Sequence, residues 1–220
     1  MATKEEVCAC IRKIGILPAI RVHAAEDALF VAREMLEYGI PVVELTTTIP
    51  DAARVIAELS KTNPHLMVGA GTVLDIETAK ACVDAGAVFV TSPGLDPKIV
   101  DFTVKHGLCA IPGALTPTEI MMAQNAGADM IKVFPCAQVG GPAYIRAMRA
   151  PFPHVPIVAS GGVDQITAAD FLRAGAQALG IRGKLIPPEA VEKRDRNWIK
   201  ELTGRFLSIV HRARQEYGLT

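Results

Sequence analysis

A lysine lies in the middle of an apolar segment that is typical of a buried strand. Residues 127–135 read GADMIKVFP, in which Lys132 has aliphatic neighbours between a glycine and a proline. Burying an unpaired ammonium is so unfavourable that the side chain would sooner lose its proton. Lysines are therefore seldom fully buried without a partner. Either Lys132 is held by a buried opposite charge, or it works as a neutral amine that can attack a carbonyl carbon.

Glu44 provides a carboxylate in a second apolar segment, YGIPVVELT. Side chains of a strand alternate between its two faces, so Glu44 shares a face with Thr46, and Lys132 shares a face with Met130 and Phe134. The opposite faces carry only leucine and β-branched residues, which suit packing against helices. A carboxylate and an amine that converge on one cavity could exchange protons and form an imine. A buried salt bridge is the structural alternative.

The strands that must position these residues recur along the chain. The segments YGIPVVELT, AGAVFVTSP, HGLCAIPG, AGADMIKVFP and AGAQALGIRG, with ILPAIRV, HLMVGAGT and HVPIVASGG, give strands starting near residues 16, 42, 66, 88, 108, 130, 156 and 178. Helix-like stretches separate them, and a glycine that fits a helix C-cap precedes most strands. Eight strand–helix units predict a (β/α)8 TIM barrel, as one domain over residues 1–220. An open doubly wound sheet is the alternative, but it lacks the expected G-x-G-x-x-G after the first strand.

Both ends of the chain are expected to add helices to the barrel. Thr3 and Glu6 predict a capping box that opens a short N-terminal helix. Residues 188–217 are expected to form the eighth helix and a C-terminal extension, with a packing stripe of Trp198, Leu202, Phe206 and Ile209.

Such a barrel places the second and sixth strands opposite each other, so that Glu44 and Lys132 face one cavity at similar height. Barrel enzymes carry their chemistry at the C-terminal ends of the strands. In this chain those ends carry Arg21, Thr72, Ser92-Pro93-Gly94, Ser160-Gly161-Gly162 and Arg182-Gly183-Lys184. Together they indicate a site for an anionic small molecule, because glycines after the seventh and eighth strands often bind phosphate through backbone N–H groups.

Composition excludes several other classes of function. The chain has 220 residues with 23 basic and 23 acidic side chains, so no excess positive charge suggests a nucleic-acid or membrane-surface partner. No apolar run approaches the roughly 20 residues that span a bilayer. Five scattered cysteines form no C-x-x-C pair, which predicts no metal site and reduced thiols in the cytoplasm.

With these motifs the chain resembles the KDPG/KHG aldolases, class I enzymes that act on 2-keto-3-deoxy-6-phosphogluconate (KDPG) and 4-hydroxy-2-oxoglutarate (KHG). The resemblance spans about residues 14–186 and rests on VELT at 43–46, GAGTV at 69–73, SPGL at 92–95, IPG at 111–113, IKVFP at 131–135 and SGGV at 160–163. It implies that Lys132 is the Schiff-base lysine, Glu44 the proton-transferring carboxylate and Thr72 a contact of the pyruvate moiety. It also implies a homotrimer.

The resemblance extends to the rest of the substrate. Ser160 falls where the family commonly has a threonine that bears on stereoselectivity, and Gly161 and Gly162 match its phosphate cradle. Pro93 and Phe134, within SPGL and IKVFP, are also expected to contact substrate.

Two positions depart from the family pattern. Thr48 stands where many members have an arginine for the pyruvate carboxylate, and Arg21 on the adjacent strand is expected to supply the missing charge. Gly183 stands where a serine commonly contacts phosphate, and Arg182 and Lys184 flank it. Arg182 is expected to reach the phosphate; Lys184 is either a second contact or a solvated charge.

The predicted function is a lyase that needs no metal or organic cofactor. It would cleave a 2-oxo-4-hydroxy acid to pyruvate and a second product, glyceraldehyde 3-phosphate from KDPG or glyoxylate from KHG. One alternative is a phosphate-binding barrel isomerase or epimerase, in which Lys132 is only an electrostatic group. Another is a non-catalytic barrel that binds a small molecule.

Overall fold

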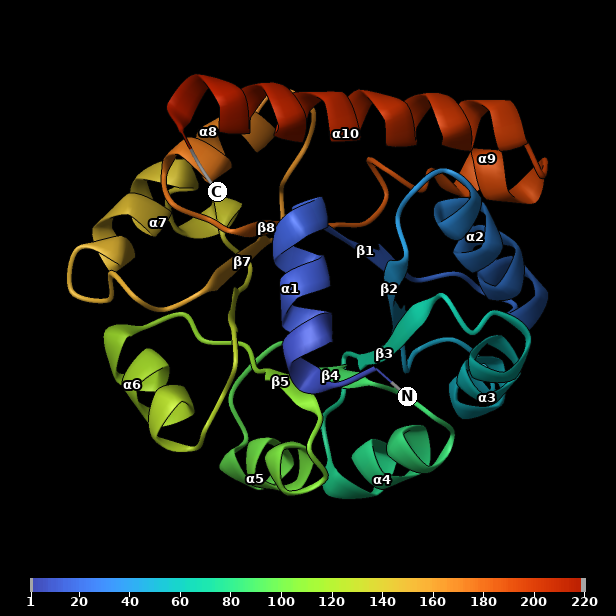
Figure 1. Cartoon of the computed structure of the whole chain (residues 1–220), viewed down its shortest axis with the longest axis horizontal. Coiled ribbons are helices and arrows are strands. Elements are labelled where there is room, and N and C mark those ends of the chain that lie inside the picture. Colours follow the sequence, from blue (N-terminus) through green and yellow to red (C-terminus); the bar gives the residue numbers. More distant parts are fainter. Residues whose placement is uncertain (1, 219–220) are drawn as a thin grey trace.

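Eight parallel strands alternate with helices in the computed structural model, which describes residues 2–218 (Figure 1). The strands are β1 (Ile16–Ile20), β2 (Val42–Thr46), β3 (Met67–Gly71), β4 (Phe89–Thr91), β5 (Cys109–Ile111), β6 (Ile131–Val133), β7 (Ile157–Ser160) and β8 (Ala178–Ile181). The helices are α1 (Lys4–Ile14), α2 (Ala25–Glu37), α3 (Ala52–Thr62), α4 (Ile76–Asp84), α5 (Pro97–Lys105), α6 (Pro117–Asn125), the 3-10 turn η1 (Ala137–Val139), α7 (Pro142–Arg149), α8 (Ala168–Arg173), α9 (Pro188–Glu192) and α10 (Arg196–Tyr217). Every predicted strand is present and starts within one residue of its predicted position.

The strands close into a barrel. Hydrogen-bonded neighbours follow the order β5-β4-β3-β2-β1-β8-β7-β6, and β1 pairs in parallel with both β2 and β8. At the remaining seam, between β5 and β6, the Lys132 N–H donates to the Pro112 carbonyl at 2.9 Å, and the Ala114 N–H donates to the Lys132 carbonyl at 3.0 Å. These bonds join the two ends of the strand order. The predicted (β/α)8 barrel is therefore confirmed, and the open doubly wound alternative is wrong.

Local sequence explains where the helices begin and end. Thr3 and Glu6 form the predicted capping box of α1: Thr3 Oγ1 accepts from the Glu6 N–H, and the Glu6 carboxylate accepts from the Thr3 N–H. Gly86 and Gly127 follow α4 and α6 with φ of 100° and 90°, a left-handed conformation that favours glycine. These turns lead the chain directly into β4 and β6 and so fix where each strand starts.

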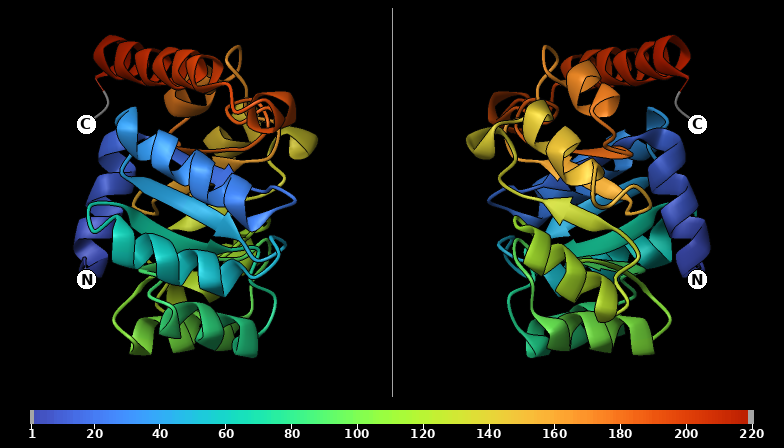
Figure 2. Two further views of the ribbon diagram at one scale, coloured as in Figure 1. Left: turned by 90° about the vertical axis from the view of Figure 1, so that its right-hand side faces the viewer. Right: turned by 90° about the vertical axis from the view of Figure 1, so that its left-hand side faces the viewer.

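Helix α1 lies across the end of the barrel at which the strands begin (Figure 1 and Figure 2). Val7 and Ile11 of this helix are fully buried. The strand arrows in Figure 2 point away from α1, toward the opposite end of the molecule. The C-terminal strand ends, where barrel enzymes carry their chemistry, are thus far from the N-terminal helix.

The predicted C-terminal extension is helix α10, which packs beside α8 and α2 (Figure 1). It buries Ile199, Phe206 and Val210, whereas Trp198 is 38% exposed. Of the predicted packing stripe, Phe206 is buried, Leu202 and Ile209 are half-buried and pack against the core, and Trp198 is exposed.

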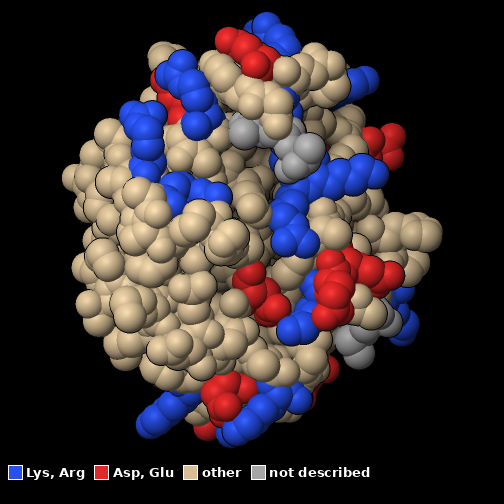
Figure 3. Space-filling model, turned by 60° about the vertical axis from the view of Figure 1, so that its left-hand side comes forward, with Lys and Arg blue, Asp and Glu red and all other residues tan. Residues whose placement is uncertain are grey.

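Charged side chains are unevenly spread over the surface. Figure 3 shows a broad area without charged side chains beside areas where basic and acidic groups mix. On helix α6, Met121 and Met122 are 55% and 47% exposed. No helix within residues 2–218 is long and apolar enough to cross a membrane.

Candidate active site

A cavity of about 690 Å³ opens at the C-terminal ends of the strands. Its walls combine residues of β1, β2, β6, β7 and β8 with the turns that follow β3, β4, β7 and β8. Of the residues that the sequence placed at the site, Thr48, Ser92 and Gly94 do not line this cavity, and the others do. A hollow of this size with converging polar groups is the usual form of a small-molecule site.

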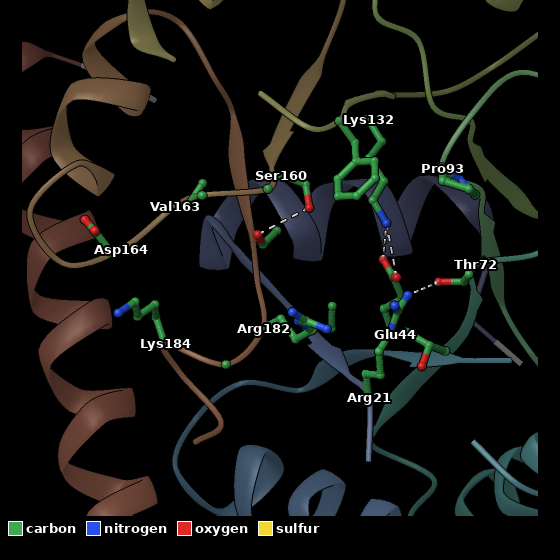
Figure 4. Close-up of a pocket in the computed structure, with 17 residues that line it drawn as sticks. Arg21, Glu44, Thr72, Pro93, Lys132, Ser160, Val163, Asp164, Arg182 and Lys184 are labelled. Atoms are coloured by element: carbon green, nitrogen blue, oxygen red, sulfur yellow. Dashed lines mark hydrogen bonds and ion pairs between the residues drawn. The ribbon is translucent and has the colours of Figure 1, made fainter. Parts of the chain in front are cut away.

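Lys132 and Glu44 meet inside the cavity (Figure 4). Lys132 Nζ donates to both Glu44 oxygens, Oε1 and Oε2, at 3.1 Å each, and the two side chains are only 8% and 2% exposed. The lysine is thus paired with a buried carboxylate, the first of the two alternatives raised by the sequence. The pairing leaves the second open, because transfer of one proton between these atoms gives a neutral amine and a carboxylic acid.

Small residues on the neighbouring strands make room for the Glu44 side chain. Glu44 lies in register with Ala19 of β1 and Gly69 of β3. A Cβ atom on Gly71 would lie 2.3 Å from Glu44 Cγ and Oε1, so any larger residue at this position would displace the carboxylate. The GAGT motif therefore preserves the geometry of the Lys132–Glu44 pair.

Arg21 and Thr72 form one part of the cavity wall. Arg21 Nη2 donates to Thr72 Oγ1 at 2.9 Å, and Thr47 Oγ1 donates to the Thr72 carbonyl at 2.9 Å. Thr72 has a φ of 59°, in the left-handed region that residues other than glycine seldom adopt. Such strain is often found at functional sites. The guanidinium and hydroxyl are held together where they could receive a carboxylate.

Thr48 lies outside the cavity lining. Residues 47 and 48 form a turn after β2, and the Thr48 side chain is exposed. Its Oγ1 is 2.9 Å from Oγ1 of Thr46, and Thr46 does line the cavity. The structure thus brings Arg21, but not Thr48, to the cavity.

The turns after β7 and β8 form the far end of the cavity. Figure 4 shows Asp164 and Lys184 at the opposite end from Thr72 and Pro93. Gly162 has a φ of 86°, and a Cβ atom on it would lie 2.2 Å from that of Ala137, so only glycine fits. Backbone rather than side chain therefore forms the wall here.

Positive charge predominates in the cavity. Among residues 2–218, neither Arg182 nor Lys184 forms an ion pair. Asp164 accepts hydrogen bonds from the Thr167 and Ile166 N–H groups at 2.9 Å each; these bonds, chiefly that from Thr167, and the nearby charge of Lys184 hold the pKa of Asp164 below its ordinary value. Four basic and two acidic side chains line the cavity, which has a net charge of +2 when all are ionised.

Other predicted residues complete the lining, namely Pro93, Phe134, Ser160, Gly161 and Gly183. Phe134 is 38% exposed, and its ring centroid is 6.0 Å from Lys132 Nζ. Ser160 Oγ donates to the Gly180 carbonyl at 3.4 Å. The Phe134 ring thus lies near the amine, and the Ser160 hydroxyl is directed at the backbone of β8.

The cavity suits an anionic organic molecule. It gathers an amine, guanidinium groups, hydroxyls and glycine backbone. Within residues 2–218, no three His, Cys, Asp or Glu side chains are placed to hold a metal ion.

Sequence reasoning did not assign three polar residues of this region to the site. Thr46 and Asp164 line the cavity, and Thr91 Oγ1 lies 3.5 Å from Lys132 Nζ. The signal for Thr46 was its place on the same strand face as Glu44. The signal for Asp164 was its position directly after the SGGV motif.

Comparison with known proteins places the chain in context. A family model described as KDPG and KHG aldolase matches residues 7–202. A 2-dehydro-3-deoxy-phosphogluconate aldolase of Treponema pallidum is 32% identical to this chain, and the match covers 91% of this chain and 95% of the relative. A protein of the same name from Pseudomonas aeruginosa is 35% identical, and the match covers 83% of each chain. Among solved structures, a KDPG aldolase from Legionella pneumophila, with pyruvate captured at low pH as a covalent carbinolamine intermediate, has a TM-score of 0.83 and 28% identity, covering 92% of this chain and 97% of its own.

Proposed function

Because this chain belongs to the KDPG and KHG aldolase family, and is thus a carbon–carbon lyase, we propose that it cleaves 2-oxo-4-hydroxy acids through an imine on Lys132. The observation that carries this proposal is the buried Lys132 amine, 3.1 Å from both oxygens of Glu44 within a positively charged cavity. The covalent carbinolamine of pyruvate in the Legionella relative supports it.

Lys132 is the nucleophile in this proposal. It gives a proton to Glu44 and attacks the keto carbon of the bound acid. A proton then moves from the attacking nitrogen to the former carbonyl oxygen, which gives a carbinolamine. Loss of water leaves a protonated imine. The imine nitrogen withdraws electrons, so that the C3–C4 bond breaks and its electron pair forms an enamine of pyruvate.

Glu44 is the acid–base group. It receives the proton that Lys132 loses and returns a proton to the oxygen that leaves the carbinolamine as water. It then takes the proton of the C4 hydroxyl, through a water molecule, as the C4 oxygen becomes an aldehyde. Protonation of the enamine at C3 and hydrolysis of the imine release pyruvate and restore the lysine.

The substrates proposed for this site are KDPG, which gives pyruvate and glyceraldehyde 3-phosphate, and KHG, which gives pyruvate and glyoxylate. The family and its relatives are named for these acids. Each substrate carries an anionic group at both ends. A cavity of net charge +2, with cations at separate positions along it, suits such molecules.

Arg21 is proposed to hold the carboxylate next to the keto carbon, because a guanidinium can donate two parallel hydrogen bonds to a carboxylate. Arg21→Met should lower kcat/KM by about 10- to 100-fold for every 2-oxo acid, as expected for a lost charged hydrogen bond. Steady-state kinetics with KDPG and KHG would measure this.

Arg54→Met is the matched control for this substitution, because Arg54 is an exposed arginine of α3, 3.9 Å from Asp51 and outside the cavity lining. Arg54→Met should leave kcat/KM for both KDPG and KHG unchanged. A pyruvate complex in which Arg21 points away from the ligand would contradict the assignment.

Arg182 is proposed to bind the phosphate of KDPG, together with the backbone of Gly161 and Gly162. Gly183 lacks the serine hydroxyl common in the family, and the neighbouring Arg182 would supply a charged donor in its place; charged hydrogen bonds are roughly twice as strong as neutral ones. Arg182→Ala should therefore reduce the preference for KDPG over its unphosphorylated analogue, while cleavage of KHG stays nearly unchanged. The measurement is kcat/KM for the three acids.

Lys184→Ala tests which of the two unpaired cations acts on the phosphate, since both line the cavity. If the preference for KDPG over its unphosphorylated analogue is lost in Lys184→Ala but kept in Arg182→Ala, Lys184 and not Arg182 binds the phosphate. Equal kcat/KM for KDPG and its unphosphorylated analogue in the unmutated protein would rule out a working phosphate site.

A cytoplasmic homotrimer is proposed for the assembled enzyme. The uncharged surface area in Figure 3 and the exposed Met121 and Met122 of α6 support contact with other copies of the chain. The five scattered cysteines support a reducing compartment.

A further inference from the structure

Thr91 carries a buried hydroxyl that the steps above do not use. It ends β4, lies in register with Ile111 of β5 and has no exposed surface. Its Oγ1 is 3.5 Å from Lys132 Nζ, yet Thr91 is not part of the cavity lining. The hydroxyl therefore reaches the amine from the protein side and does not touch a bound substrate.

Thr91 differs from the other buried threonines in its bonding partner. Thr103 and Thr203, on α5 and α10, donate their hydroxyls to backbone carbonyls one helical turn back, at 2.7 and 2.8 Å. Thr46 donates to a carbonyl of β1 at 3.0 Å. Among residues 2–218, the side chain of Thr91 has Lys132 as its only hydrogen-bonding partner. A buried hydroxyl whose hydrogen-bonding partner is the nucleophile indicates a role in the reaction.

Three acceptor atoms lie around the Lys132 ammonium. Glu44 Oε1 and Oε2 are both 3.1 Å from Nζ and share one N–H, and Thr91 Oγ1 at 3.5 Å lies within reach of another. The two kinds of acceptor behave differently during catalysis. Glu44 gains and loses protons, so its capacity to accept a hydrogen bond changes at each step, whereas the threonine hydroxyl does not titrate.

We propose, on the basis of the proposed function, that Thr91 is a positioning residue that orients the Lys132 amine for attack. After one proton has moved to Glu44, the neutral amine keeps two N–H bonds and a lone pair. The amine then rotates about Cε–Nζ. Donation of one N–H to Thr91 and of the other to the carbonyl oxygen of protonated Glu44 fixes the amine with its lone pair toward the cavity. The distance of 3.5 Å is long, but catalytic hydrogen bonds often tighten only in the substrate complex.

Thr91→Val tests this role, because valine keeps the shape of the side chain and removes the hydroxyl. We expect kcat for KDPG or KHG cleavage to fall about 3- to 10-fold, the range for one hydrogen bond between neutral groups. The rate of pyruvate trapping by borohydride should fall in parallel. KM should change less than about 3-fold, because Thr91 does not touch the substrate. Thr91→Ser, which restores the hydroxyl, should recover most of the rate.

Thr103→Val is the matched control, because it removes an equally buried hydroxyl from α5, away from the cavity. Its kinetics should equal those of the unmutated protein. If Thr91→Val does not fold, as judged by circular dichroism and thermal unfolding, Thr91→Ala and Thr103→Ala replace the pair.

Several outcomes would overturn the role of Thr91. An unchanged kcat in Thr91→Val, an equal loss in Thr91→Ser or an equal loss in Thr103→Val would show that the hydroxyl does not orient the amine. Failure of the proposed function is a separate result: the unmutated protein would then not be trapped on Lys132 by pyruvate and borohydride at all.

Discussion

Replacing Lys132 by alanine is expected to lower turnover of KDPG and KHG by on the order of 10⁴-fold or more, the range seen when a covalent nucleophile is removed. Without the amine no imine forms, and the C3–C4 bond has no electron acceptor. The cavity and Arg21 remain, so substrate analogues should still bind. The measurement is steady-state cleavage, with ligand binding followed by calorimetry.

Stability must be separated from catalysis in this variant, because Lys132 and Glu44 form a buried pair. Removing one partner of such a pair leaves an uncompensated charge, which costs about 3–5 kcal/mol of folding free energy. The double variant Lys132→Ala/Glu44→Gln removes both charges and should regain stability without regaining activity. Turnover near the normal level in a folded Lys132→Ala protein would show that Lys132 is only an electrostatic group, as in the isomerase alternative.

Glu44→Gln is expected to lower turnover by about 10²- to 10⁴-fold, as for loss of a general acid–base group. Glutamine keeps the size of the side chain and still offers an oxygen to Lys132 Nζ, but it cannot take up the proton. Imine formation should become slow rather than absent. Rapid-quench trapping with pyruvate and borohydride should therefore reach the same final yield at a lower rate.

Gly71→Ala provides an independent check on the position of the Glu44 carboxylate, because a Cβ atom there would overlap Glu44. It should lower turnover in the same direction as Glu44→Gln. Near-normal turnover in Glu44→Gln would reduce Glu44 to a structural partner of Lys132.

The sequence predicts the barrel and its central pair because both depend on short-range periodicity. Strand alternation alone puts Glu44 and Lys132 on one face each, and barrel symmetry brings β2 and β6 together. The pairing of β1 with β8 could not be read from any single strand, because closure is a property of the whole sheet. The eight regularly spaced strands predicted it indirectly.

Features that depend on side-chain packing were beyond the sequence pattern. The exposure of Trp198 on α10 could not be read from the helical spacing, because spacing does not show how the helix is rotated on the barrel. The turn after β2 directs Thr48 to the surface, a backbone path that the sequence does not specify. Thr91 was not assigned to the site because a single threonine at the end of a strand reads as a turn or packing residue until its distance to Lys132 is known.

The central claim is that Lys132 forms the covalent imine, and trapping tests it most directly. The protein is treated with pyruvate and sodium borohydride, and its peptides are analysed by mass spectrometry, with Lys132→Ala and a sample without pyruvate as controls. We predict a stable reduced adduct on Lys132, within residues 130–135, that is absent from both controls. A label on another lysine, or no label on the active unmutated protein, would contradict the account.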